Sequence, residues 1–271
     1  MSPAHADLLA AYDAGLRDEA EMSGARQWHR RGPLAVGVFD HGGFVSYRDL
    51  GGLDGDALDD LVASTVAWFR EETDVAEVEW KTRGHDLPAD LPARLEAHGF
   101  EPDEVETVMV GRAVLLAADV PLPAGVHVRR AGDGRDLRVD LEATGRLQAE
   151  VFGTAMRDLE ERLRTLTEHP NRTGVWLAET DDGTVVSVGR LEVVPGTGFA
   201  GLWGGATREE WRGRGIYRAL VAARARAALA MGAELVHSDC SAMSRPILER
   251  SGLVPVTTTT PYVWRRAGAT G

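Results

Sequence analysis

The chain has 271 residues, of which 44% are hydrophobic and 27% charged, and its formal net charge is −12. This length suits one large domain or two modest ones, and the acidic balance disfavours nucleic acid and anionic membranes as partners. No apolar run approaches the roughly 20 residues that span a bilayer, and the N-terminus lacks the features of a signal peptide. The single cysteine, Cys240, has no internal disulfide partner, so we expect a cytoplasmic protein.

The first half of the chain alternates helix and strand patterns. Residues 1–31 are expected to form one helix followed by a basic end, Arg26 to Arg31. The further expected elements are hairpin 33–50, helix 54–74, strand 75–80, helix 87–99 and strand 105–117. His41-Gly42-Gly43 marks the turn of the hairpin, and Asp56 is the expected N-cap of the helix that follows.

Two prolines and a glycine lie between apolar segments in residues 117–125, which is typical of a linker. We therefore divide the chain into residues 1–118, a linker at 119–124 and residues 125–271. The expected elements of the second part are strand 125–131, helices 136–153 and 154–170, hairpin 174–194, strand 198–207, helix 216–231, strand 234–240, helix 243–252 and strand 259–266.

The two parts share a short internal echo. LEAHGFEP at 95–102 matches LERSGLVP at 248–255, and both lie in the order strand, helix, glycine, strand. A duplicated fold with a shortened first copy accounts for this echo. Chance is the alternative, because a helix followed by glycine and a strand is common.

The segment EEWRGRGIYRALVAARARAALAMG, residues 209–232, places glycines and arginines directly before a helix. The first N–H groups of a helix have no internal partner, and they attract anions together with the helix dipole. Gly213 and Gly215 allow close approach to the backbone, and Arg212 and Arg214 add permanent charge. The segment therefore predicts a phosphate-binding turn, although it fits neither the Walker pattern nor the dinucleotide fingerprint. The alternatives are a solvated basic turn and an Arg-Gly contact to nucleic acid.

This turn resembles the pyrophosphate loop of the GCN5-related N-acetyltransferases (GNATs), R/Q-x-x-G-x-G/A. Arg212-Gly213-Arg214-Gly215-Ile216 fits the pattern, and Tyr217 departs from the small residue usual at the last position. The resemblance extends over residues 125–266. It implies an α+β fold with a central mixed sheet flanked by helices, in a tandem form whose N-terminal copy is degenerate. It also implies that acetyl-CoA contacts Gly204, Gly205, Ala206, Thr207, Arg212, Gly213, Arg214, Gly215, Ile216, Tyr217 and Arg218.

Members of the family often use a glutamate or a water chain as the base and a tyrosine as the acid. The usual tyrosine position is Leu248 here, so Ser244 is our candidate hydrogen-bond donor, its alternative role being a helix N-cap. Glu192 is our candidate base, its alternative role being a solvent-facing strand residue, and Asp239 is the second candidate.

Other polar positions are given structural roles or left open. His237, Asp239 and Cys240 alternate across one strand, so we expect no metal, and we expect Cys240 to be a buried core thiol. The polar segment 80–86 either lines an acceptor pocket or is only a strand-to-helix connection. The loop at 46–56 carries Gly51-Gly52 among several aspartates, so we expect the first half not to bind coenzyme A.

Together these features predict a bacterial N-acetyltransferase that passes acetyl from acetyl-CoA to a primary amine of a small molecule in a ternary complex. The acidic net charge favours a cationic acceptor. One alternative is a GNAT-fold module that binds acyl-CoA without turnover, and another is a protein that modifies or binds a macromolecule. The sequence leaves monomer and homodimer open.

Overall fold

The computed structural model describes residues 3–156 and 158–268. They fall into two compact units. The first contains the described residues up to Val108, with Asp239–Ala242 and those from Pro255 onward; the second contains Met109–Ser238, apart from residue 157, and Met243–Val254.

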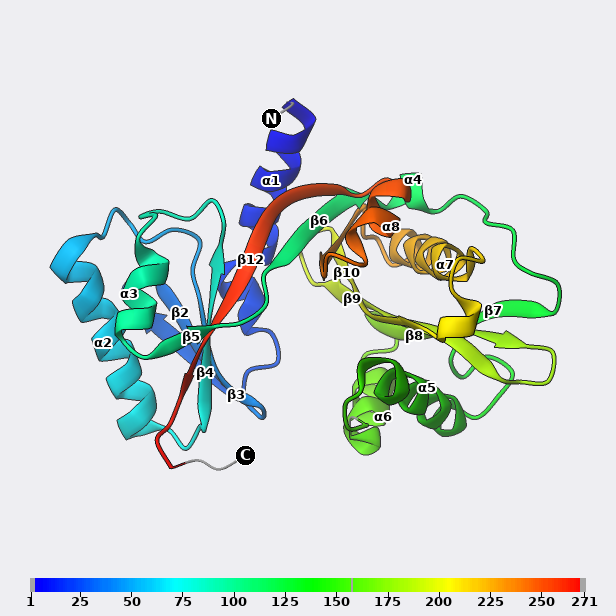
Figure 1. Cartoon of the computed structure of the whole chain (residues 1–271), viewed down its shortest axis with the longest axis horizontal. Coiled ribbons are helices and arrows are strands. Elements are labelled where there is room, and N and C mark those ends of the chain that lie inside the picture. Colours follow the sequence, from blue (N-terminus) through cyan, green and yellow to red (C-terminus); the bar gives the residue numbers. More distant parts are fainter. Residues whose placement is uncertain (1–2, 157, 269–271) are drawn as a thin grey trace. The chain divides into compact units, whose positions relative to one another are not determined.

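The first unit is a sheet with helices on its faces (Figure 1). Its strands lie in the order β1-β2-β3-β4-β12, with β5 on β12; β3 and β4 run parallel and the other pairs antiparallel. Its elements are α1 (Pro3–Leu16), the 3-10 helix η1 (Asp18–Met22), β1 (Gln27–Arg31), β2 (Leu34–Phe39), β3 (Gly42–Ser46), α2 (Gly55–Glu72), β4 (Glu77–Arg83), α3 (Leu91–Ala97), β5 (Phe100–Pro102) and β12 (Val254–Arg265).

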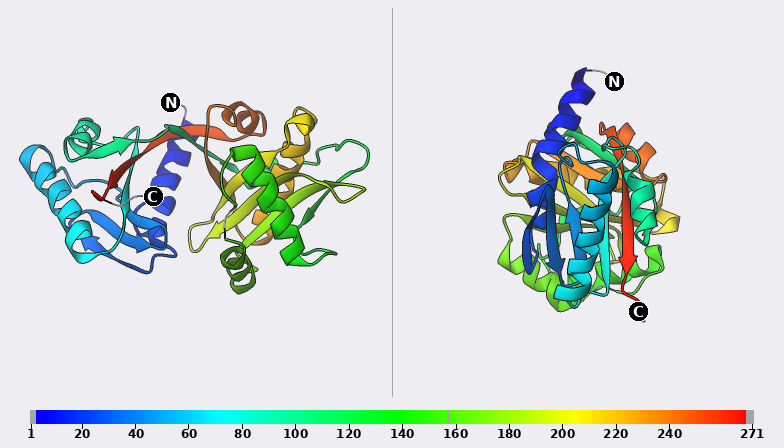
Figure 2. Two further views of the ribbon diagram at one scale, coloured as in Figure 1. Left: turned by 60° about the horizontal axis from the view of Figure 1, so that its bottom comes forward. Right: turned by 90° about the vertical axis from the view of Figure 1, so that its left-hand side faces the viewer.

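Alternation along β2 builds the core of this unit. Leu34, Val36 and Val38 face α2 and α3, where they pack with buried side chains such as Leu58. On the other face Gly37 lies against η1, and a Cβ there would come within 2.8 Å of a methionine sulfur. The right-hand view of Figure 2 looks onto this unit from its helical side, with α2 in front of the strands.

The second unit has the strand order β11-β10-β9-β8-β7, in which only the pairing of β10 with β11 is parallel. Helix α7 covers one face of this sheet, and α5 and α6 cover the other (Figure 1). Its elements are α4 (Ala113–Leu116), β7 (Val126–Arg130), α5 (Leu137–Phe152), α6 (Leu159–Glu168), β8 (Thr173–Thr180), β9 (Val185–Val194), β10 (Phe199–Thr207), the 3-10 helix η2 (Glu209–Trp211), α7 (Ile216–Ala230), β11 (Leu235–Cys240) and α8 (Arg245–Arg250).

Most predicted elements are present, but several boundaries differ. The N-terminal helix is shorter than predicted, because α1 ends at Leu16, and the basic end of this region lies in β1, which joins the sheet beside β2. Asp54 rather than Asp56 occupies the N-cap position of α2. The strand predicted at 105–117 is β6 (Glu106–Arg112) followed by α4, and the last strand begins at Val254 rather than at residue 259.

The two units do not follow a linear division at residue 118. Strand β12 pairs with β4 and β5, so the end of the chain completes the sheet of the first unit. Strand β6 begins in the first unit and ends in the second. Among the described residues, no helix combines the length and the apolar character that crossing a membrane requires.

Candidate functional site

Strands β10 and β11 separate part-way along their length. Their parallel pairing begins at Phe199 and ends where Gly201 lies opposite His237, although β10 continues to Thr207. Just beyond, the Ser238 hydroxyl donates to the carbonyl of Leu202 at 2.9 Å. A strand edge that loses its partner presents backbone N–H and C=O groups, which is what an extended, amide-containing ligand needs.

A β-bulge lies in the free part of β10. The register with β9 shifts between Trp203 and Ala206, and the intervening Gly204 has a φ of +58°. The carbonyl of Gly204 accepts from Gln148 of α5 at 2.8 Å. A Cβ at Gly205 would come within 2.6 Å of the Tyr217 ring, so the two bulge glycines lie against helices on opposite faces.

The turn from β10 to α7 has the backbone of an anion cradle. Gly213 and Gly215 have φ values of +73° and +81°, and Gly215 is the N-cap of α7. A Cβ at Gly213 would meet nothing within 4 Å, so open space lies beside Gly213, whereas a Cβ at Gly215 would lie 3.5 Å from the carbonyl oxygen of Pro121. Arg212 donates to the carbonyl of Thr207 at 3.1 Å, which ties the loop to the end of β10.

The charges of this turn remain accessible. Arg214 is exposed and stacks on Trp211, with its guanidinium carbon 5.0 Å from the ring centroid. The first intrahelical bond of α7 that closes on the N-cap runs from Ala219 to Gly215, so the preceding N–H groups of the first turn point out of the helix. The loop therefore fits a pyrophosphate by backbone conformation, open space and charge together.

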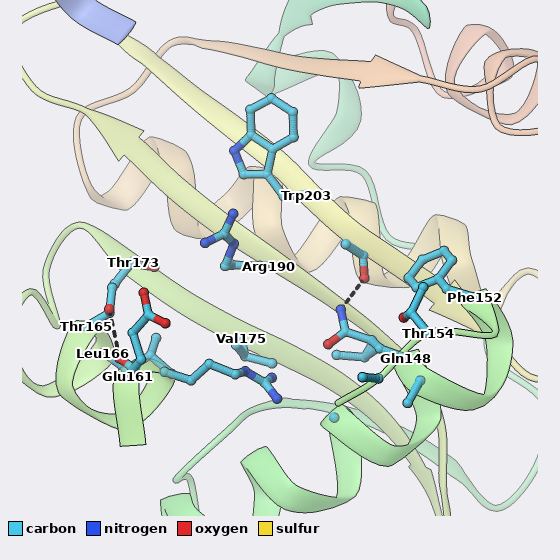
Figure 3. A pocket seen from close by; sticks show the side chains of 16 residues that line it. Gln148, Phe152, Thr154, Glu161, Thr165, Leu166, Thr173, Val175, Arg190 and Trp203 are labelled. Atoms are coloured by element: carbon cyan, nitrogen blue, oxygen red, sulfur yellow. Dashed lines mark hydrogen bonds between the residues drawn. The ribbon is translucent and has the colours of Figure 1, made fainter. Parts of the chain in front are cut away.

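A cavity of about 440 Å³ opens on the α5 and α6 side of the sheet (Figure 3). The described lining residues come from α5, α6, β8, β9, β10 and residues 154–155 after α5, so all of them belong to the second unit. Apolar groups on these walls include Phe152, Leu166, Val175, Val188 and Trp203; polar groups include Gln148, Thr154, Glu161, Arg162, Thr165, Thr173 and Arg190.

The candidate base Glu192 lies level with the point where β10 and β11 part. Glu192 is opposite Gly201 on one side, and Gly201 is opposite His237 on the other. Directly opposed residues share a face, and Arg190, two positions before Glu192 on β9, lines the cavity. Glu192 therefore faces the cavity side of the sheet, with 46% of its side chain exposed and 3.5 Å from Arg190.

An aromatic side chain covers the place where Glu192, Gly201 and His237 lie opposite one another. A Cβ at Gly201 would lie 2.2 Å from the Trp203 indole nitrogen, so the indole folds back over Gly201. The Trp203 ring then meets His237 edge to face at 5.0 Å between centroids. Sequence reasoning considered His237 only as a metal ligand and did not single out Trp203 or Arg190. Alternation along the strands is the signal that would place Trp203 and Arg190 on one face. Using it requires the register of β9 with β10, which the sequence does not give.

The other catalytic candidates lie elsewhere. Ser244 occupies the N-cap position of α8, but its hydroxyl makes no capping hydrogen bond. Leu248, at the position of the family's tyrosine, is buried. Asp239 belongs to the first unit, where it accepts from Lys81 at 2.8 Å. Burial lowers the pKa of Lys81, but Asp239 and Glu21 outweigh it and raise the pKa well above its usual value.

In the first unit the corresponding positions are filled by its own side chains. Strands β3 and β4 are paired as far as Val45, and beyond this the Ser46 hydroxyl donates to Glu21, which also accepts from Arg83 at 2.7 Å. In the loop before α2, the Asp49 carboxylate accepts the N–H of Gly51 at 2.7 Å. A carboxylate at this place repels phosphate.

The polar segment 80–86 is partly buried in the first unit. Trp80 is fully buried in its core, and Asp86 accepts from Tyr47 at 2.6 Å and from Arg17 at 2.7 Å. His85 hydrogen-bonds Thr257 at 2.8 Å. These contacts give the segment a structural role within this unit.

Residues 141–251 match the family model described as the acetyltransferase (GNAT) family. The chain carries a GNAT acetyltransferase domain. This domain includes the split strands, the glycine turn and α5 to α8, and it identifies the protein as an acyltransferase. No curated protein matches the sequence.

Solved structures extend the likeness to the whole chain. A GCN5-related N-acetyltransferase from Kribbella flavida superposes with a TM-score of 0.69 at 16% identity, over 93% of this chain and 94% of that one. Another from Sphaerobacter thermophilus gives 0.64 at 21% identity, over 88% and 79%. A tandem GNAT protein from the clavulanic acid biosynthesis pathway gives 0.62 at 16% identity, over 98% and 97%. The fold is therefore that of tandem GNAT proteins.

Proposed function

We propose that the GNAT domain transfers an acetyl group from acetyl-CoA to the primary amine of a small molecule, by direct attack in a ternary complex. The observation that carries this proposal is the separation of β10 and β11 beyond Gly201 and His237. The glycine turn before α7 follows from one end of β10, and Glu192 and the cavity lie beside the split. A donor thioester held at the split would face an acceptor held in the cavity.

The acetyl-CoA pyrophosphate is proposed to bind the turn, where Gly213, Gly215 and the first N–H groups of α7 supply donors. Arg212, Arg214 and Arg218 would add positive charge. The pantetheine amides are proposed to pair with the free backbone of β10 at the bulge. The complete set of proposed contacts is Gly204, Gly205, Ala206, Thr207, Arg212, Gly213, Arg214, Gly215, Ile216, Tyr217 and Arg218.

The proposed reaction is an acyl transfer with Glu192 as the base. Glu192 removes a proton from the ammonium, directly or through water, and the free amine attacks the thioester carbonyl carbon to form a C–N bond. The tetrahedral intermediate collapses, the C–S bond breaks, and the thiolate leaves and takes up a proton. Ser244 is the proposed hydrogen-bond donor to the leaving sulfur. A thiol is acidic enough (pKa ~8.5) that its loss does not demand a tyrosine.

A second function, binding acyl-CoA without turnover, is favoured by two residues. Tyr217 occupies the position where the family has a small residue, and its ring lies against Gly205 in the free part of β10. Leu248 replaces the family's acid and is buried. The Tyr217 ring would hinder entry of the donor, and Leu248 supplies no acid for catalysis. Neither residue conflicts with the fold.

Calorimetry with acetyl-CoA and with free coenzyme A tests the cradle, and release of free thiol with a panel of amines tests the transfer. We expect micromolar binding at one site per chain and thiol release that depends on the amine. Binding without thiol release for every amine would establish the binding module instead. No binding at millimolar acetyl-CoA would contradict both functions.

A further inference from the structure

The cavity beside Glu192 is lined by apolar and by charged side chains. Val175 and Val188 of the sheet and Leu166 of α6 are buried lining residues, whereas Phe152 at the end of α5 is exposed. Figure 3 shows Val175, Leu166 and Phe152 around the cavity. A volume of about 440 Å³ lies within the range of ligand sites, roughly 300–1,000 Å³. Such walls favour an acceptor whose side chain is apolar, because burying apolar surface stabilises the complex.

Two opposite charges stand side by side at the edge of this cavity. Arg190 and Glu192 lie on the same face of β9, 3.5 Å apart, with 38% and 46% of their side chains exposed. Arg190 is opposite Trp203 and Glu192 is opposite Gly201, so Glu192 lies nearer the last paired row of β10 and β11. Glu192 therefore lies next to the place proposed for the thioester. Arg190 lies two residues away along β9, on the side of the cavity.

The position of Arg190 is fixed from the far face of the sheet. The buried Arg224 of α7 donates to the carbonyl of Arg190 at 3.1 Å. A Cβ at Gly189 would lie 2.5 Å from the Arg224 guanidinium carbon, so that guanidinium lies flat on the strand. This contact holds the backbone from which the Arg190 side chain extends into the cavity.

A second guanidinium adds to the positive charge of the cavity wall. Arg162 of α6 donates to the carbonyl of Leu141 at 3.0 Å and to the Thr144 hydroxyl at 3.2 Å. A Cβ at Gly145 would lie 2.8 Å from Arg162, so a glycine inside α5 makes room for this arginine. Among the described residues, the charged groups of the lining are Arg162, Arg190 and the carboxylate of Glu161.

Resting on the proposed function, we infer that the acceptor is an α-amino acid with an apolar side chain. The zwitterion complements the charge pair: its carboxylate binds Arg190, for which the planar guanidinium is suited, and its ammonium faces Glu192. This orientation presents the nitrogen to the split between β10 and β11, and the side chain enters the apolar part of the cavity. The expectation of a cationic acceptor rested on net charge, and the local charges oppose it because two guanidinium groups repel a polyamine.

The test compares acceptors that differ only in the carboxylate. L-leucine and 3-methylbutylamine share the amine and the side chain, and only leucine carries the carboxylate. We expect kcat/KM from thiol release to be higher for leucine by about tenfold or more, since only leucine carries a carboxylate that can form charge-assisted hydrogen bonds with the Arg190 guanidinium. Arg190→Gln should remove this preference, so that the ratio of the two kcat/KM values falls to near one, whatever the change in the two absolute rates.

The matched control is Arg146→Gln, which removes an exposed arginine on α5 that pairs with Glu142 at 3.1 Å. It should leave the preference for leucine unchanged, and thermal unfolding of both variants checks that the fold is intact. Equal turnover of the two amines by the wild type, or a preference that survives Arg190→Gln, would overturn the inference and leave the proposed function standing.

Absence of thiol release with every amine would instead overturn the proposed function. Calorimetry with L-leucine in the presence of coenzyme A then decides the inference by itself. Binding that is lost in Arg190→Gln and kept in Arg146→Gln supports an amino-acid site, and the absence of binding overturns it.

Discussion

The ring of Tyr217 lies against Gly205, so that a Cβ at position 205 would come within 2.6 Å of a ring carbon and 3.0 Å of the hydroxyl oxygen. The two residues come from α7 and from the bulge of β10, the two elements proposed to hold the cofactor. The Tyr217 ring of α7 thus occupies the space that a side chain at position 205 of β10 would need.

This match predicts coupling between the two positions. Gly205→Ala should destabilise the protein by about 1–3 kcal/mol, because the ring cannot move without disturbing the first turn of α7. In a Tyr217→Ala background the same change should cost much less, and denaturant unfolding of the four proteins measures the difference. Additive effects would mean that the ring does not rest on the bulge.

Gly215→Val should weaken coenzyme A binding by about tenfold or more, because the N-cap of α7 has a φ of +81° and a β-branched residue would change the backbone that presents the N–H groups. Gly134→Val is the control for backbone strain, since Gly134 also has a positive φ but lies before α5, away from the turn. Calorimetry on both variants makes the comparison, and equal affinities would remove the case for the cradle.

The glycine turn was predictable from the sequence because its chemistry is local. Gly213 and Gly215 with their arginines occupy adjacent positions, and no distant contact is needed to recognise the pattern. The side chains that define the cavity were not predictable in this way. Arg190, Glu192 and Trp203 share a face only through the register of β9 with β10 and through the bulge, neither of which the sequence states.

The partner of the last strand is a further case. The alternating pattern after Thr257 predicts a strand, but nothing in it predicts pairing with β4 of the first unit. Thr259 lies opposite Arg83 and Arg265 opposite Glu77, and these partners are more than 170 positions apart in the sequence. Local pattern determines that a strand forms, whereas its neighbours are determined by packing across the whole unit.

Gly52→Val, in the corresponding loop of the first unit, should leave coenzyme A affinity and the stoichiometry of one site per chain unchanged. Gly52 has a φ of +75° with open space around it, so the backbone strain resembles that of the cradle variant. The Asp49 carboxylate already accepts an N–H of this loop and opposes phosphate. A second binding site in calorimetry, or weakened binding in this variant, would contradict this account.

Glu192→Gln should lower kcat by about a hundredfold while the KM for acetyl-CoA changes little, because the variant keeps the shape of the side chain and loses the proton acceptor. Glu142→Gln, an exposed carboxylate of α5, is the control and should behave as wild type. A full rate in Glu192→Gln would assign the base to another group, such as a water molecule bound near His237.

Asp140→Asn tests the largest ion network of the second unit. Asp140 accepts from both Arg129 Nη atoms at 2.6 and 2.7 Å and from the Gly132 N–H at 2.8 Å, and its side chain is 1% exposed. Burial raises the pKa of Asp140, but the hydrogen bonds from Arg129 and Gly132 outweigh it, so the pKa lies below its usual value. At pH 7 we expect a loss of about 3 kcal/mol, because the variant leaves Arg129 without half of its pairing.

The effect of this substitution should depend on pH in one direction. A carboxyl whose pKa is lower in the folded state stabilises the protein above its unfolded pKa of about 3.9, and this contribution is lost as the pH falls through the folded pKa. The gap between wild type and Asp140→Asn should therefore be full near pH 7 and shrink below about pH 4. Glu160→Gln, at an exposed pair with Arg138, should show little change at either pH. Urea unfolding at several pH values measures these gaps, and a gap that stays constant down to pH 2 would show that the carboxylate charge contributes nothing to the fold.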